Sequence, residues 1–137
     1  MLELKDFEAA YNKVQEVALP TKLIKSDYFS DQTGNDIYLK PENMQLTGAY
    51  KIRGAYYKIS TLSEEEKAKG LITASAGNHA QGVALAAARQ GVKATIVMPT
   101  TTPLLKVNRT KDLGAEVILH GDVYDEACAH ALDLAAE

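Results

Sequence analysis

Three short apolar segments in the second half of the chain each lead into a segment with helical spacing. The strand-like segments are residues 71–74, 94–98 and 116–119. Gly91 and Gly114 end the first two helical segments, and Asp122 is placed to cap the third. Strands that alternate with helices in this way predict a parallel sheet with right-handed crossovers. The predicted fold class is therefore α/β, a three-layer arrangement of a parallel sheet and flanking helices.

Two predicted helices precede this alternating section. Residues 52–61 have the apolar spacing of a helix. Ser63, followed three positions later by Glu66, is a capping-box signature for a second and shorter helix, which Gly70 ends. The regular part of the fold is therefore expected to start near residue 51.

The first fifty residues have a different pattern. Residues 4–17 carry apolar side chains at helical spacing, which predicts an amphipathic helix. The irregular section that follows contains a predicted hairpin turn at residues 32–35 and a short strand at 37–39, which Pro41 ends. We expect this section to be an arm that packs against another part of a larger structure.

The composition excludes several classes of protein. With 46% apolar and 24% charged residues, the 137-residue chain has the make-up of one soluble globular domain. Its net charge of −3 gives no attraction for nucleic acid or an anionic membrane, and no apolar run approaches the ~20 residues of a membrane span. The single cysteine, Cys128, excludes an internal disulfide and favours the reducing cytoplasm as location.

Lys51 is the first candidate for chemistry. It follows a glycine turn in the stretch 47–55 (Thr-Gly-Ala-Tyr-Lys-Ile-Arg-Gly-Ala) and lies in the first turn of a predicted helix. The partial positive charge of a helix N-terminus and partial withdrawal from water both disfavour the cationic form of a lysine. Such a lysine can react as a neutral amine with a carbonyl group. The alternative is an ordinary solvated lysine on a helix face.

The second candidate is the turn between a predicted strand and the helix that starts near residue 78. In residues 75–79 (Ser-Ala-Gly-Asn-His), backbone N–H groups can converge on an anion, and Ser75 and Asn78 add side-chain donors. The alternative is a plain strand-to-helix turn in which Ser75 or Asn78 is the N-cap. A nucleotide loop is excluded because Val83 and Ala84 stand where a P-loop has lysine and serine or threonine. No metal site is predicted, because the three histidines are scattered.

Together the two stretches resemble the fold-type II pyridoxal-phosphate enzymes, and most closely the threonine dehydratases (threonine ammonia-lyases). The resemblance covers residues 20–137, with both motifs in the family's order and spacing. It implies a tryptophan-synthase-β-like fold and pyridoxal 5′-phosphate as cofactor. It also implies that L-threonine and L-serine are converted to a 2-oxo acid and ammonia by a cytoplasmic homo-oligomer. Isoleucine biosynthesis and threonine catabolism stay open as the metabolic setting.

The resemblance also implies roles for individual residues. Lys51 would carry the cofactor covalently and move the α-proton of the substrate, and Asn78 would hydrogen-bond the 3′ oxygen of the cofactor. Tyr50, where the family has phenylalanine, would lie against the cofactor. The residues implied to hold the substrate carboxylate are Ser75, Gly77, Asn78 and His79.

Part of the family's site has no counterpart in these residues. The family anchors the cofactor phosphate in a glycine-rich loop that follows the region matched here. We therefore expect the chain to be an N-terminal portion: residues 1–53 an arm belonging with a large cofactor domain, and 54–137 a small parallel α/β domain, incomplete at its C-terminal end. The 137-residue chain alone is expected to be inactive. The alternative is a non-catalytic α/β module that binds an amino acid or self-associates.

Overall fold

The computed structural model describes residues 1–136 and confirms the predicted α/β class. Its main sheet has the order β3-β4-β5, from strands β3 (Leu71–Ala74), β4 (Ala94–Met98) and β5 (Glu116–Leu119). Both pairs are parallel, with Leu71 opposite Ala94 and Thr95 opposite Glu116. The three strands coincide with the predicted segments because short apolar runs bounded by glycine leave little freedom in placing a buried strand.

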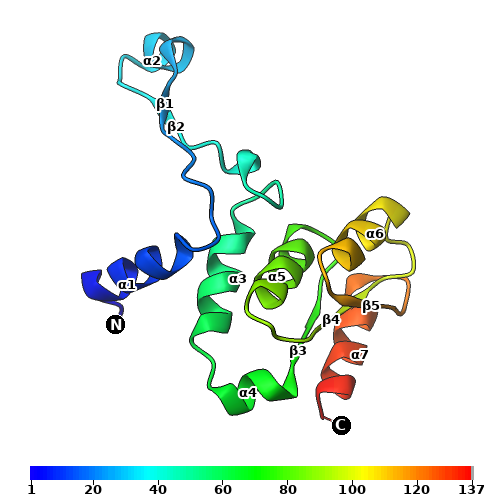
Figure 1. Cartoon of the computed structure of the whole chain (residues 1–137). Helices are drawn as coiled ribbons and strands as arrows, with labels where there is room; N and C mark the ends of the chain where they lie inside the picture. Colours follow the sequence, from blue (N-terminus) through cyan, green and yellow to red (C-terminus); the bar gives the residue numbers. More distant parts are fainter. Residues whose placement is uncertain (137) are drawn as a thin grey trace.

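Helices cover both faces of this sheet (Figure 1). On one face lie α5 (Asn78–Arg89) and α6 (Leu104–Asp112), which follow β3 and β4 as crossovers. On the other face, α7 (Tyr124–Ala136) packs across β3 and β4, where Ala127 and Ala131 contact Val97 in a second, smaller core. The predicted cap of α7 was wrong. Helix α7 starts at Tyr124, and the carboxylate of Asp122 instead accepts a hydrogen bond from Thr100 Oγ1 at 2.9 Å. This bond joins Asp122 to the loop after β4 and not to the N–H groups of α7.

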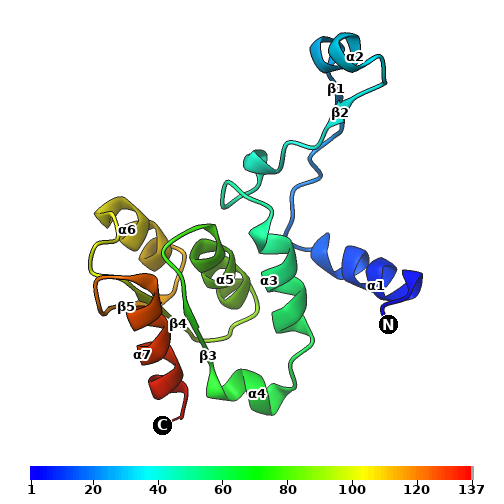
Figure 2. The same ribbon diagram turned by 180° about the vertical axis from the view of Figure 1, so that it is seen from behind.

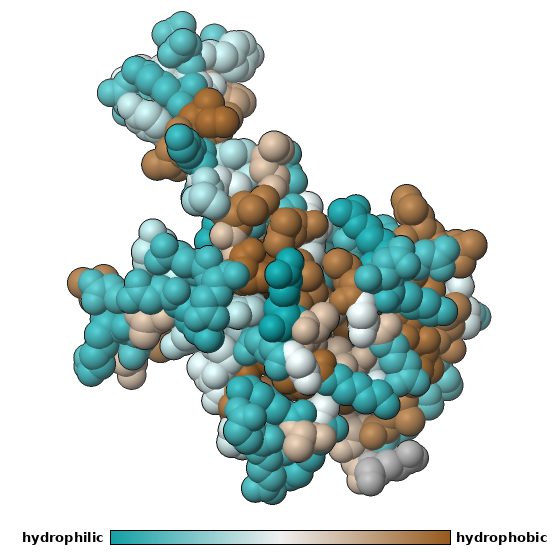
Figure 3. Space-filling view, viewed as in Figure 1, coloured by the Kyte–Doolittle hydropathy of each residue, from teal (hydrophilic) through white to brown (hydrophobic). Residues whose placement is uncertain are grey.

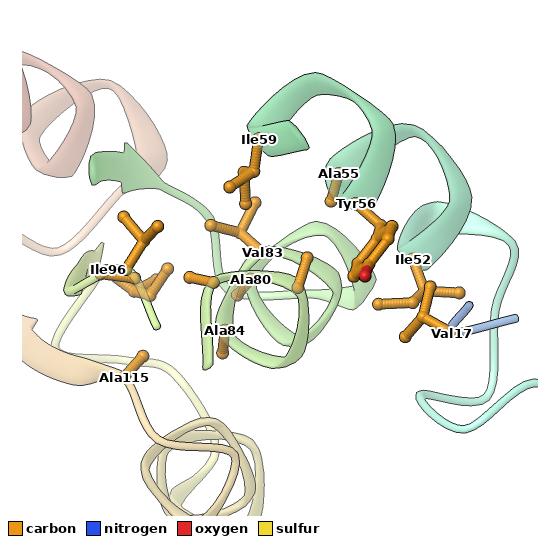
Figure 4. Close-up of a cluster of buried hydrophobic side chains, with 14 of the residues drawn as sticks. Val17, Ile52, Ala55, Tyr56, Ile59, Ala80, Val83, Ala84, Ile96 and Ala115 are labelled. Atoms are coloured by element: carbon orange, nitrogen blue, oxygen red, sulfur yellow. The ribbon is translucent and has the colours of Figure 1, made fainter. Parts of the chain in front are cut away.

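One further helix lies outside α5, beyond the three layers formed by α7, the sheet, and α5 with α6. Helix α3 (Lys51–Ser60) packs along α5 and buries Ile52, Ala55 and Ile59 against it, as Figure 4 shows. The short helix α4 (Glu64–Lys69) then returns the chain to β3 and has the predicted capping box. The alanine-rich face of α5 allows this close packing, since small side chains let two helices approach.

The first fifty residues form an arm that extends from this body (Figures 1 and 2). It contains α1 (Leu4–Val14), the antiparallel pair β1 (Ile24–Lys25) and β2 (Tyr38–Leu39), α2 (Asp27–Thr33) and the 3-10 turn η1 (Glu42–Met44). The predicted hairpin turn at residues 32–35 was wrong, because Gly34, with φ +66°, is the C-cap of α2. The predicted helix 4–17 ends three residues early, at Val14.

Apolar side chains are exposed along much of the arm and beside it (Figure 3). They include Leu23, Ile24, Tyr28, Phe29, Tyr38 and Leu39. Among residues 1–136, no helix is both long enough and apolar enough to span a bilayer.

Candidate active site

Lys51 is the first residue of α3, as predicted. The residue before it, Tyr50, makes no side-chain capping bond, and the first turn of α3 carries no acidic residue. The N–H groups at this helix start are therefore left to other partners. Lys51 itself is exposed, so the expected partial withdrawal of its side chain from water was wrong for these residues.

The amine of Lys51 has few neighbours. Its Nζ lies 5.3 Å from the centre of the Tyr50 ring, within range of a cation–π contact. Within residues 1–136, no ion pair or hydrogen bond engages this amine. A lysine that is not paired with a carboxylate is available for chemistry with a ligand.

The turn that follows β3 is organised by Ser75. Its backbone N–H donates to the Val97 carbonyl at 3.1 Å and so extends the sheet by one residue. Its Oγ accepts hydrogen bonds from the N–H groups of Gly77 and Ala80, both at 3.3 Å. Ser75 thus satisfies one N–H group in the first turn of α5, but the N-cap itself is Gly77, so the interpretation of Ser75 or Asn78 as N-cap was wrong. With both lone pairs of the oxygen used, the hydroxyl hydrogen is left to donate elsewhere.

The start of α5 has no negative charge of its own. Its N-cap is Gly77, which has no side chain to accept a bond, and no acidic residue occurs in the first turn. Asn78 and His79 are exposed there. Although His79 is exposed as a residue, its ring is partly desolvated. This desolvation, and then the nearby positive charge of Lys51, lower the pKa of His79, so its imidazole is neutral at neutral pH. This helix start can therefore accept an anion with no carboxylate to compete.

One cavity brings part of the predicted set together. It measures about 490 Å³ and lies between α3 and the free edge of β3, with Tyr50, Lys51, Thr73 and His79 on its wall. Ser75, Gly77 and Asn78 are not part of this wall. A larger cavity of about 630 Å³, lined by Gly70, Lys93 and Leu134 among others, includes none of the predicted site residues. The smaller cavity is therefore the candidate site.

Gly82 holds the two halves of this site together, and sequence reasoning did not find it. A β-carbon added to Gly82 would lie 3.1 Å from the carbonyl carbon of Lys51 and 3.2 Å from the N of Ile52. The absence of a side chain thus lets α5 touch the backbone at Lys51. The available signal was a glycine inside an otherwise helical pattern, which often marks close packing.

A second feature that sequence reasoning missed is the ion pair between Glu42 and Arg53. Arg53 Nε and Nη2 each donate to the Glu42 carboxylate at 2.8 Å. These bonds, opposed by burial and aided by bonds from Thr21 and Gln45, lower the pKa of Glu42 to about 2. The pair joins the arm to the first turn of α3, two residues after Lys51. Among residues 1–136, no three His, Cys, Asp or Glu side chains are grouped as metal ligands would be.

Comparison with known proteins shows which family the chain belongs to. Residues 14–137 match the family model described as pyridoxal-phosphate dependent enzyme. The chain is 54% identical over 132 residues to L-threonine ammonia-lyase of Thermotoga maritima, and 50% identical over 126 residues to the biosynthetic L-threonine dehydratase of Haemophilus influenzae. These alignments cover 96% and 92% of the chain but 33% and 25% of the relatives. The chain therefore spans about a quarter to a third of their length.

Solved structures of similar proteins have the same fold as this chain. The processed threonine deaminase isoform 2 of Solanum lycopersicum matches 98% of the chain at 44% identity with a TM-score of 0.87. Maize serine racemase matches 98% at 30% identity with a TM-score of 0.90. These matches cover 39% and 41% of the two solved chains. The predicted resemblance, its fold and its cofactor are confirmed: the chain belongs to the family of pyridoxal-phosphate dependent enzymes.

Proposed function

We propose that this chain is the lysine-bearing part of a threonine dehydratase, which converts L-threonine, and L-serine, to a 2-oxo acid and ammonia. The relatives named above support this substrate class. The observation that carries the proposal is the contact at Gly82. It sets the start of α3, with Lys51, against α5, whose first residues form the anion-accepting turn.

The residues present fit pyridoxal phosphate. Lys51 offers an amine with no ion-pair partner in the described part of the chain, beside an aromatic ring and a cavity of about 490 Å³. Lys51 would be the attachment point, and Tyr50 and Asn78 would contact the cofactor. When bound, the cofactor supplies the electron-withdrawing ring that makes the α-carbon of the substrate acidic.

The side chains described here then have distinct tasks. The Ser75 hydroxyl hydrogen and the N–H groups at the start of α5 would hold the substrate carboxylate, with Gly77 and Asn78 in this turn. This grip orients the α-carbon toward Lys51, whose amine would take and return a proton there. His79, whose pKa is lowered by partial desolvation and by Lys51, would contact the carboxylate as a neutral imidazole, through a ring N–H and not through a positive charge.

The proposal includes an assignment of the two parts of the chain. Residues 1–53 would belong with a larger cofactor domain, and 54–137 would be the smaller domain. The exposed apolar side chains of the arm support this, because such surfaces usually contact another surface. We further propose a cytoplasmic homo-oligomer that acts in amino-acid metabolism. The similarity to biosynthetic relatives supports a setting in isoleucine biosynthesis.

The same exposed surfaces favour a second candidate for the 137-residue chain alone. A module with this much uncovered apolar surface would self-associate rather than catalyse. Light scattering of the purified chain, with L-threonine turnover followed in parallel, separates the two. Turnover by a monodisperse monomer would show that residues 1–137 hold a complete site.

The main experiment is chemical labelling of the natural gene product with its cofactor. Borohydride should bleach the yellow absorbance and leave a label on Lys51, and L-threonine should release 2-oxobutyrate. Lys51→Ala should abolish the label and lower turnover by at least about 1,000-fold, because the attachment and the proton transfer are both lost. The matched control is Lys58→Ala, seven residues along α3 on the wall of the same cavity. A label that maps to Lys58 would refute the assignment.

A further inference from the structure

The start of α3 lacks the usual means of fixing a helix N-terminus. Tyr50 gives no side-chain cap, and Gly48 two residues earlier has φ +71°, a conformation that glycine adopts without strain. An uncapped first turn frays readily. Yet the proposed chemistry needs the Lys51 amine to be held within about 0.5 Å of its working position. Something outside the helix must hold this turn.

Glu42 and Arg53 supply that hold from the side of the arm. The two parallel bonds of 2.8 Å from Arg53 fix both the direction and the rotation of its guanidinium. Because Arg53 lies in the first turn of α3, the same bonds fix the rotation of that turn. The side chains of both residues are mostly buried, 20% exposed for Glu42 and 31% for Arg53, so water competes weakly.

Glu42 is itself held by a polar network. Thr21 Oγ1 donates to its Oε1 at 2.8 Å, and Gln45 Nε2 donates to the same oxygen at 3.4 Å. The Gln45 amide also bonds both the N–H and the carbonyl of Leu19 at 2.9 Å. The carboxylate therefore rests on two separate segments of the arm, one at residues 19–21 and one at Gln45.

Gly82 limits the same turn from the side of α5. Its α-carbon allows α5 to contact the Lys51 backbone, and no side chain lies between the two helices there. The first turn of α3 is thus held by two separate contacts, the bonds of Arg53 to the Glu42 carboxylate and the backbone contact with α5.

From this arrangement we infer that Glu42 is a positioning residue for Lys51, which acts through Arg53 to set the rotation of the first turn of α3. The inference rests on the proposed function for its catalytic consequence. Its structural consequence, an ordered first turn, does not depend on that function.

The test compares Glu42→Gln, which keeps the shape and removes the charge, with Arg53→Lys, which keeps the charge and removes the paired donors. Both should lower kcat about tenfold or more and leave KM within about twofold, because the amine is misplaced while the carboxylate grip on α5 is intact. Glu42 has a pKa of about 2 and is ionised throughout pH 6–9. The loss in kcat should therefore be equal across that range, unlike the loss of a titrating base.

Amide hydrogen exchange supplies a readout that does not depend on turnover. Exchange of the amides of residues 53–55, whose N–H groups bond carbonyls at the start of α3, should become at least about tenfold faster in both variants, because the first turn opens more often. The control is Glu16→Gln, which removes a carboxylate that bonds Lys13 and the Tyr56 hydroxyl farther along α3. It should leave kcat and the exchange of residues 53–55 unchanged.

The outcomes separate this inference from the proposed function. A wild-type protein without turnover would refute the proposed function, and the exchange comparison would still decide whether Glu42 orders the turn. If exchange at residues 53–55 in Glu42→Gln matches that in Glu16→Gln, the inference is wrong. It is also wrong if Arg53→Lys keeps wild-type kcat, since the paired donors would then be unnecessary. Arg53→Lys retains the ion pair, so it serves as the test if Glu42→Gln does not fold.

Discussion

The helices α4 and α5 begin in opposite ways. At the start of α4, the Ser63 hydroxyl accepts from the Glu66 N–H at 3.2 Å, and the Glu66 carboxylate accepts from the Ser63 N–H at 2.8 Å. Three glutamates fill its first turn. At the start of α5, Gly77 offers no side-chain cap, and no acidic residue follows. The Ser75 hydroxyl reaches back to only part of that helix start.

We infer from this difference that the start of α5, and not that of α4, is available to bind a ligand. Caps and acidic residues in the first turn satisfy the N–H groups and the dipole of α4 from within the chain, which is the usual way to stabilise a short helix. The start of α5 gives up that stabilisation and stays attractive to an external anion. The usual preference for a side-chain cap and acidic residues at a helix start is expected to fail at binding sites. Helix α3, which starts at Lys51, also lacks both features.

Among the changes that test this comparison of α4 with α5, adding a charge to the start of α5 should produce the largest effect. Asn78→Asp places a carboxylate where the substrate carboxylate is proposed to bind. We expect KM for L-threonine to rise about 100-fold from like-charge repulsion. The stability of the protein should stay the same or rise by about 0.3–1 kcal/mol, because a negative charge suits a helix N-terminus. Steady-state kinetics and urea unfolding measure the two quantities.

The matched control is Asn108→Asp, the same chemical change at an exposed position inside α6. It should change neither KM nor kcat. If Asn78→Asp also leaves KM unchanged, the start of α5 does not hold the substrate carboxylate, and the comparison of the two helix starts loses its functional meaning.

The second prediction concerns the contact that joins α5 to Lys51. Gly82→Ala puts a methyl group 3.1–3.2 Å from backbone atoms of Lys51 and Ile52, which cannot rotate away. We expect a loss of about 1–3 kcal/mol in the free energy of unfolding and a lower kcat, because α3 must shift. Gly54→Ala, in the middle of α3 with open space around it, should instead stabilise by about 0.5–1 kcal/mol. Equal effects of both substitutions in chemical denaturation would contradict this role for Gly82.

The sequence predicted the strands and helices after residue 60 well for a physical reason. In this section each strand is a short apolar run, and the helices α4, α5 and α6 are bounded by glycine or a cap, so local preference and burial agree. The α4 capping box is the clearest case, because its signature and its geometry depend on the same four residues.

Predictions for the arm were less successful because local signals there have more than one meaning. Gly34 was correctly recognised as a turn residue, but a left-handed glycine ends a helix as readily as it makes a hairpin. Helix α2 buries none of its seven residues, so it has no apolar pattern to reveal it. The Glu42–Arg53 pair and the Gly82 contact join segments far apart in sequence, and one sequence gives no measure of such distances.

The smallest effect is expected at the capped helix. Ser63→Ala removes the hydroxyl that accepts a hydrogen bond from the Glu66 N–H. It should lower the free energy of unfolding by about 1 kcal/mol. It should leave kcat and KM unchanged, since α4 does not contribute to the proposed site.

The same pair makes this cost depend on pH. The backbone N–H of Ser63, and then its hydroxyl, lower the pKa of Glu66. The stabilisation from this pair is therefore present above the ordinary pKa of the carboxyl and is lost as the pH falls through the lowered value. The cost of Ser63→Ala, measured by urea unfolding, should accordingly be smaller in strong acid than at pH 7. Ser60→Ala, which removes a hydroxyl that donates back to the Tyr57 carbonyl at the end of α3, should show no such dependence. A rise in KM for Ser63→Ala equal to that of Asn78→Asp would show that capped and uncapped helix starts are not functionally distinct.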